Sequence, residues 1–113
     1  MEAEQTKNFI KGAVAAETEN AKKTYGETYH SEHEAWAVLN EEGEEANEAL
    51  FKIGNILHIL WRFVRKAEKT EEDIQHVKDN LHYLQDHAKE LATEAVQIAA
   101  VAQKYIDTME ESK

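Results

Sequence analysis

Two acidic stretches carry the side chains best suited to chemistry. The first is Glu41-Glu42-Gly43-Glu44-Glu45, and the second is Glu94-Ala95-Val96-Gln97. Glu42 and Glu45 are three residues apart, so in a helix they share one face, about 4.5 Å apart along the axis. Carboxylate and amide oxygens that converge inside a helix bundle are ligands for a hard divalent cation, Mg²⁺ or alternatively Mn²⁺. Whether they converge depends on the helices that carry them.

Apolar and small residues recur at steps of four and three along most of the chain, which indicates two long helices, about 31–68 and 71–109. The seam of the first is Ala35, Leu39, Glu42, Ala46, Ala49, Ile53, Ile56, Leu60, Phe63 and Ala67. The seam of the second is Ile74, Val77, Leu81, Leu84, Ala88, Leu91, Ala95, Ile98, Ala102 and Tyr105. This period is typical of helices that pack at a shallow angle.

Start signals for both helices agree with these seams. Ser31 with Glu34, and Thr70 with Asp73, each fit an N-cap whose side chain bonds the third residue on. Residues 68–70 alone remain to join the two helices, so we expect them to pack antiparallel as neighbours.

The hairpin sets which residues face each other. In an antiparallel pair, the numbers of facing residues have a nearly constant sum, here about 139 from the position of the turn. Glu42 then lies opposite Gln97, and Glu45 lies opposite Glu94. Glu42 also fills a seam position that should be apolar, and a buried carboxylate is costly unless it is paired or bound to a metal. We therefore expect Glu42, Glu45, Glu94 and Gln97 to be metal ligands. The alternatives are a solvated acidic surface and a Gln97 amide that only hydrogen-bonds to Glu42.

The rest of the chain adds a shorter helix over about residues 5–25. It is apolar at Phe9, Ile10, Ala13 and Val14, and Gly26 can end it in the left-handed conformation. The sequence contains no strand pattern. We predict a single all-α domain over residues 1–113, a helical bundle built on the long antiparallel hairpin plus the N-terminal helix.

Composition limits the partners. The net charge is −10, from 13 basic and 23 acidic residues, which disfavours binding to a nucleic acid polymer. The absence of cysteine excludes disulfides and thiolate chemistry. No apolar run approaches the ~20 residues of a membrane span, and the polar N-terminus is unlike a signal peptide. We expect a cytoplasmic protein without a membrane partner. Because 113 residues give a modest core, we also expect a homodimer or homotetramer.

Two further side chains are candidates for binding a substrate. Trp36 precedes Glu41 by about one helical turn and could stack on a nucleobase, although aromatic residues at helical spacing more often belong to a core or subunit interface. Lys104 follows Glu94 on the same helix and could reach a phosphate. The alternative for Lys104 is a solvated side chain.

The two acidic stretches, read with their neighbours, resemble a known family. The blocks are His33-Glu34-Ala35-Trp36-Ala37-Val38-Leu39-Asn40-Glu41-Glu42-Gly43-Glu44-Glu45 and Glu94-Ala95-Val96-Gln97-Ile98-Ala99-Ala100-Val101-Ala102. They are similar to the MazG-like nucleotide pyrophosphohydrolases, in particular the short versions of phages and Gram-positive bacteria. By this resemblance Glu42 and Glu45 match the E-x-x-E ligands, and Glu94 the first residue of E-x-x-D. Gln97 stands where aspartate is usual, and the connection between the motifs is longer.

The resemblance implies an all-α enzyme that hydrolyses a nucleoside triphosphate, NTP or dNTP, to the monophosphate and pyrophosphate with Mg²⁺. The metal would neutralise charge and lower the pKa of the attacking water, and Glu41 or Glu45 could accept its proton. The alternative is a non-catalytic helical nucleotide-binding or protein-interaction module with a degenerate metal site, which Gln97 favours.

Overall fold

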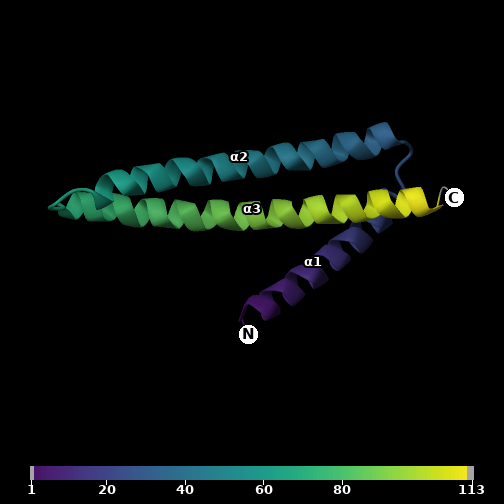
Figure 1. Ribbon diagram of the computed structural model, residues 1–113, viewed down its shortest axis with the longest axis horizontal. Helices are drawn as coiled ribbons and strands as arrows, with labels where there is room; N and C mark the ends of the chain where they lie inside the picture. Colours follow the sequence, from purple (N-terminus) through teal and green to yellow (C-terminus); the bar gives the residue numbers. More distant parts are fainter. Residues whose placement is uncertain (1, 112–113) are drawn as a thin grey trace. The chain divides into compact units, whose positions relative to one another are not determined.

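The chain folds into three helices (Figure 1). The computed structural model describes residues 2–111 and contains no strand in that range. Helix α1 spans Glu2–Tyr25, α2 spans Glu32–Val64 and α3 spans Glu71–Glu111. Helices α2 and α3 pack closely as an antiparallel hairpin, so the predicted all-α hairpin with an N-terminal helix is confirmed. No helix among these residues combines the length and apolar character needed to cross a membrane.

Local signals at the helix ends behave as predicted. Helix α1 ends at Gly26, whose φ is 100°, and the Gly26 N–H donates to the Lys22 carbonyl at 2.9 Å. At the start of α2, the Glu34 N–H donates to the Ser31 hydroxyl at 3.1 Å. These contacts satisfy backbone groups that a helix end leaves without partners.

The start of α3 is a reciprocal cap. The Asp73 N–H donates to the Thr70 hydroxyl at 3.0 Å, and the Thr70 N–H donates to the Asp73 carboxylate at 3.0 Å. The Asp73 carboxylate also accepts from the Lys66 ammonium at 2.8 Å. The pKa of Asp73 falls to about 2, chiefly because of the Lys66 bond and then the Thr70 N–H.

The predicted end of the first long helix was wrong by four residues. Helix α2 ends at Val64, so residues 65–70 form the loop, and Ala67 is an exposed loop residue rather than the last residue of the seam. The Lys66 N–H bonds the carbonyl three residues back at 3.1 Å, which tightens the chain and ends the α-helix. The contact of Lys66 with Asp73 then holds the tightened turn against the start of α3.

The chain divides into two compact units. The first contains Met1–Glu44 and Thr93–Lys113, hence α1, the start of α2 and the end of α3. The second is Glu45–Ala92, which contains the end of α2, the loop and the start of α3.

The second unit keeps the predicted seam and register. Ala49 and Ile56, both seam residues of α2, are buried. The Phe63 ring stacks on the His76 ring at 5.8 Å between centroids. This pair, like Lys66 with Asp73, keeps the residue-number sum of about 139 expected of the antiparallel hairpin.

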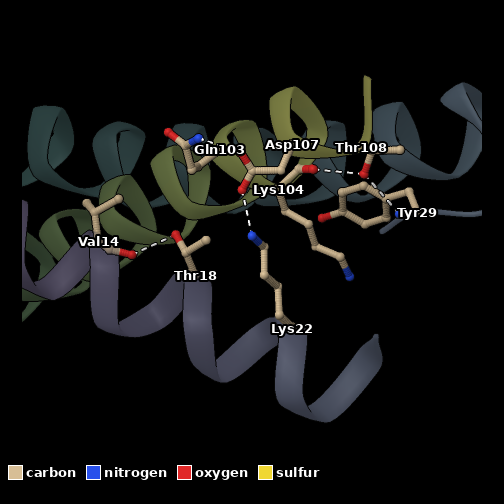
Figure 2. Close-up of polar contacts among 8 residues, drawn as sticks. All are labelled: Val14, Thr18, Lys22, Tyr29, Gln103, Lys104, Asp107 and Thr108. Atoms are coloured by element: carbon tan, nitrogen blue, oxygen red, sulfur yellow. Dashed lines mark hydrogen bonds and ion pairs between the residues drawn. The ribbon is translucent and has the colours of Figure 1, made fainter. Parts of the chain in front are cut away.

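The first unit buries a second face of α3. Its apolar core includes Ala35 of α2 and Ala100 of α3. Helix α1 is held to α3 by an ion pair of 2.6 Å between Lys22 and Asp107 (Figure 2). The hydrogen bond between them raises the pKa of Lys22 and lowers that of Asp107. Because α1 covers this face, Ala100 and Lys104 are the most buried residues of α3, although neither lies on the predicted seam.

Candidate functional site

Glu42 is the centre of a group of carboxylates. It is half-buried on α2, and one of its oxygens lies within 4.8 Å of an oxygen of Glu94 on α3, both in the first unit. An oxygen of Glu45, one turn further along the same helix, lies within the same distance of Glu42. Glu42 and Glu94 are therefore the two predicted carboxylate ligands that the first unit brings together from different helices.

The donor set fits a hard divalent cation. At Mg²⁺–oxygen distances of about 2.1 Å, two ligands of one ion lie at most about 4.2 Å apart. Oxygens separated by 4.8 Å or less reach that range with small side-chain rotations. All the donors are oxygens, which suits Mg²⁺ or Mn²⁺ and not a thiophilic metal.

The four predicted ligands are not equivalent. Glu42, Glu94 and Gln97 are half-buried, whereas Glu45 is exposed. Gln97 and Glu42 both line a cavity of the first unit. The carboxylate oxygens near that of Glu42 belong to Glu94 and Glu45. Glu41, the other predicted catalytic residue, is exposed. It lies on the adjoining face of α2, about 100° around the helix from Glu42.

A cavity of about 470 Å³ lies beside Glu42 within the first unit. All three helices and the connector between α1 and α2 form its walls. The lining residues are Glu17, Ala21, Tyr25, Tyr29, His30, Glu34, Val38, Glu42, Gln97, Val101 and Lys104. Cavities of this size hold small-molecule ligands when a few polar groups converge in them.

Lys104 is the one basic side chain other than histidine in this lining. It is only 3 % exposed, so the alternative of a solvated lysine was wrong. Its ammonium lies 4.3 Å from the centroid of the Tyr29 ring, a cation–π contact (Figure 2). No carboxylate is found within ion-pair distance of this ammonium in residues 2–111, which leaves it able to bind an anion from the cavity.

Tyr29 is held in place by the chain around Lys104. The Tyr29 N–H donates to the Thr108 hydroxyl at 3.1 Å, and that hydroxyl donates to the Lys104 carbonyl at 2.8 Å (Figure 2). Burial raises the pKa of Tyr29, and the negative charges of Glu34 and Glu42 add to the effect. The Tyr29 phenol is therefore neutral near pH 7 and can donate a hydrogen bond into the cavity.

Trp36 lies outside this cavity. It is 61 % exposed and lines a separate hollow with Glu32, His33 and Tyr105. Sequence reasoning missed the tyrosines of the cavity, Tyr25 and Tyr29. Tyr25 follows Glu17 and Ala21 at steps of four on α1, a spacing visible in the sequence. No pattern in the sequence, however, gives the position of α1 relative to the hairpin.

Comparison with protein-family models, curated proteins and solved structures finds no match to this chain. The resemblance to the MazG-like family thus stays a prediction, carried by the two sequence blocks alone.

Proposed function

We propose that this protein is a nucleotide pyrophosphohydrolase that depends on a divalent cation and converts an NTP or dNTP to the monophosphate and pyrophosphate. The observation that carries the proposal is a single cavity lined by Glu42 of α2 and by Gln97 and the buried Lys104 of α3. A phosphate chain carries several negative charges, and its hydrolysis is accelerated mainly by positioning and by compensating positive charge.

The proposed reaction is hydrolysis of a phosphoanhydride bond of the nucleotide. A cation held by Glu42, Glu94, Glu45 and Gln97 would supply charge neutralisation and a lower pKa for the water. Glu45, one turn from Glu42, is the first choice to accept the proton, and Glu41 on the adjoining face is the second. Lys104 holds a phosphate oxygen, and pyrophosphate leaves without a covalent intermediate on the protein.

The charge of the cavity supports the dependence on a cation. Three glutamates line it, Glu17, Glu34 and Glu42, against the single lysine Lys104. A free triphosphate would be repelled by this excess of negative charge, whereas its complex with a divalent cation would not. We therefore expect no turnover without Mg²⁺ or Mn²⁺.

We also propose that the second unit pairs with a second copy of the chain. Leu50, Leu57, Trp61 and Val64 are each more than half exposed on α2. Their spacing, with Gly54 between the first two, gives alternating steps of four and three. This spacing forms a stripe that fits another helix at a shallow angle. A two-helix unit buries little apolar surface alone, so a homodimer, or a homotetramer made from dimers, supplies the missing core.

Pyrophosphate release from a panel of NTPs and dNTPs tests the proposed activity. We expect release with Mg²⁺ or Mn²⁺, none with chelator, and a loss of at least 100-fold in kcat/KM for Glu42→Gln, because that change removes a charged ligand. Glu48→Gln is the matched control, since Glu48 is exposed on the same helix and pairs with Lys52 at 3.6 Å. Folded protein that releases no pyrophosphate from any nucleotide would overturn the proposal.

A non-catalytic nucleotide-binding or interaction module is the second candidate, favoured by the uncharged amide of Gln97 among the ligands. Thermal unfolding separates the candidates cheaply. A site raises the unfolding midpoint selectively with Mg²⁺ or Mn²⁺, whereas a solvated acidic surface responds about equally to any divalent cation.

A further inference from the structure

One wall of the cavity beside Glu42, the cavity that Lys104 also lines, has no role in the proposed hydrolysis. It consists of Glu17, Ala21 and Tyr25, which follow each other at steps of four on α1 and all line the cavity. Ala21, which lies between Glu17 and Tyr25 along the helix, has a small side chain. Tyr25 is 79 % exposed, so one face of its ring is open to a ligand.

Of the three glutamates that line the cavity, Glu17 is the one to which we have assigned neither a metal nor a hydrogen bond. Glu42 belongs to the metal ligands, and an oxygen of Glu34 accepts the His30 N–H at 2.9 Å. Glu17 is half-buried, and no cation is found within ion-pair distance of it in residues 2–111. A half-buried carboxylate that lines a ligand-sized cavity needs a hydrogen-bond donor to offset its lost hydration.

A second, independent feature of the cavity is a buried positive charge, which suits an anion at that end. Lys104 is only 3 % exposed and lines the cavity. Its ammonium contacts the Tyr29 ring rather than a carboxylate. An anionic group of the ligand therefore belongs at Lys104. The part of the ligand that reaches α1 then meets an acceptor, Glu17, and an aromatic face, Tyr25.

We propose that this cavity selects nucleotides whose base carries an exocyclic amino group, with the phosphate at Lys104, the base against Tyr25 and the amino group donating to Glu17. A carboxylate is an acceptor only. The amino groups of cytosine and adenine donate to it, whereas uracil and thymine present a carbonyl oxygen at the corresponding position. The inference rests on the proposed nucleotide site and adds its base specificity.

CMP and UMP are matched probes, because their bases differ where cytosine has its amino group. Calorimetric titration of the full chain with Mg²⁺ present measures binding separately from hydrolysis, because a monophosphate has no phosphoanhydride bond to hydrolyse. We expect CMP to bind about tenfold more tightly than UMP, the effect of one hydrogen bond to a charged group. Glu17→Gln should reduce this ratio to about one, since an amide can pair with either base. Glu19→Gln, an exposed change on the same helix, should keep the wild-type ratio.

Lys104→Met should weaken the binding of CMP and of UMP by the same factor, because both nucleotides carry the same phosphate. Equal binding of the two nucleotides to the wild type, or binding of neither, would overturn the inference whatever the variants do. If CTP and UTP are hydrolysed equally while CMP and UMP bind equally, the base specificity is wrong and the hydrolase stands. If CMP is preferred and no triphosphate is hydrolysed, the hydrolase is wrong and the base site stands.

Discussion

The Lys104 ammonium lies 4.3 Å from the centre of the Tyr29 ring, and the lysine is 3 % exposed. Burial disfavours a charged ammonium, and one cation–π contact restores only part of the lost hydration. A residue of this kind is not explained by stability alone. Because it lines the cavity that also contains Glu42 and Gln97, we propose that its second role is to bind an anionic ligand.

Lys104→Met separates these two roles. Methionine has a similar length and no charge, so we expect the free energy of unfolding to stay the same or rise. Nucleotide affinity should fall at least tenfold, because a charge-assisted contact to phosphate is lost. Chemical unfolding and calorimetric titration measure the two quantities, with Lys11→Met, an exposed lysine of α1, as the control. Unchanged affinity would show that Lys104 is structural only.

The low pKa of Asp73 predicts that the stability of the second unit depends on pH. Its pKa is about 2 in the folded protein against the ordinary 3.8, because Lys66 and the Thr70 N–H donate to the carboxylate. The folded-state pKa lies below that of the unfolded chain, so this stabilisation is fully present above about pH 4. It is lost as the pH falls from about 4 to about 2.

The measurement is urea unfolding of wild type and Asp73→Asn across the same acid range. The wild-type free energy of unfolding should fall more steeply than that of the variant, whose amide does not titrate. Asp86→Asn, on the exposed side of α3, should follow the wild type. Parallel curves for all three proteins would mean that the contact between Lys66 and Asp73 does not persist in solution.

Gln97→Asp should strengthen cation binding. The change adds a carboxylate to the α3 side of the cavity, at the position where the family that the sequence resembles has aspartate. Without a divalent cation, the added repulsion should lower the unfolding midpoint. With Mg²⁺, the midpoint should rise more than in the wild type, and the Mg²⁺ affinity should increase about tenfold, or ~1.4 kcal/mol. An identical response to Mg²⁺ in both proteins would remove Gln97 from the ligand set.

Trp61→Glu tests the pairing of the second unit. Trp61 is 55 % exposed in the apolar stripe of α2, and a buried, unpaired carboxylate at an interface is strongly unfavourable. Sedimentation or light scattering should show a dimer or tetramer for the wild type and mostly monomer for the variant. Tyr83→Glu, at a comparably exposed aromatic residue on α3, should leave the assembly unchanged. A monomeric wild type would contradict the proposed pairing.

The parts of the fold that follow local or periodic rules were predictable. The caps at Ser31 and Thr70 depend on side chains three residues apart, and the burial of Ala49 and Ile56 follows from the seam. A short connection sets the register of a hairpin, so Phe63 and His76 could be paired from the sequence. The predicted carboxylates Glu42 and Glu94 meet for the same reason.

The position of α1 could not be predicted in this way. Lys22 and Asp107 are 85 residues apart in the chain, and no repeated spacing links them. The connector that starts at Gly26 and carries Tyr29 sets how α1 returns to α3, and with it the burial of Lys104. The cavity depends on that return, so the α1 residues that line it were not found from the sequence.

We propose that a divalent cation binds at Glu42 and Glu94, and Mn²⁺ titration followed by NMR tests this site most directly. Paramagnetic Mn²⁺ broadens the signals of nearby nuclei. We predict that amides around Glu42, Glu94 and Gln97 broaden first, at less than one equivalent, and that Glu42→Gln abolishes this order. Broadening that starts instead at other acidic positions, such as Glu71 and Glu72, or spreads evenly over the acidic surface, would contradict the metal site and the activity built on it.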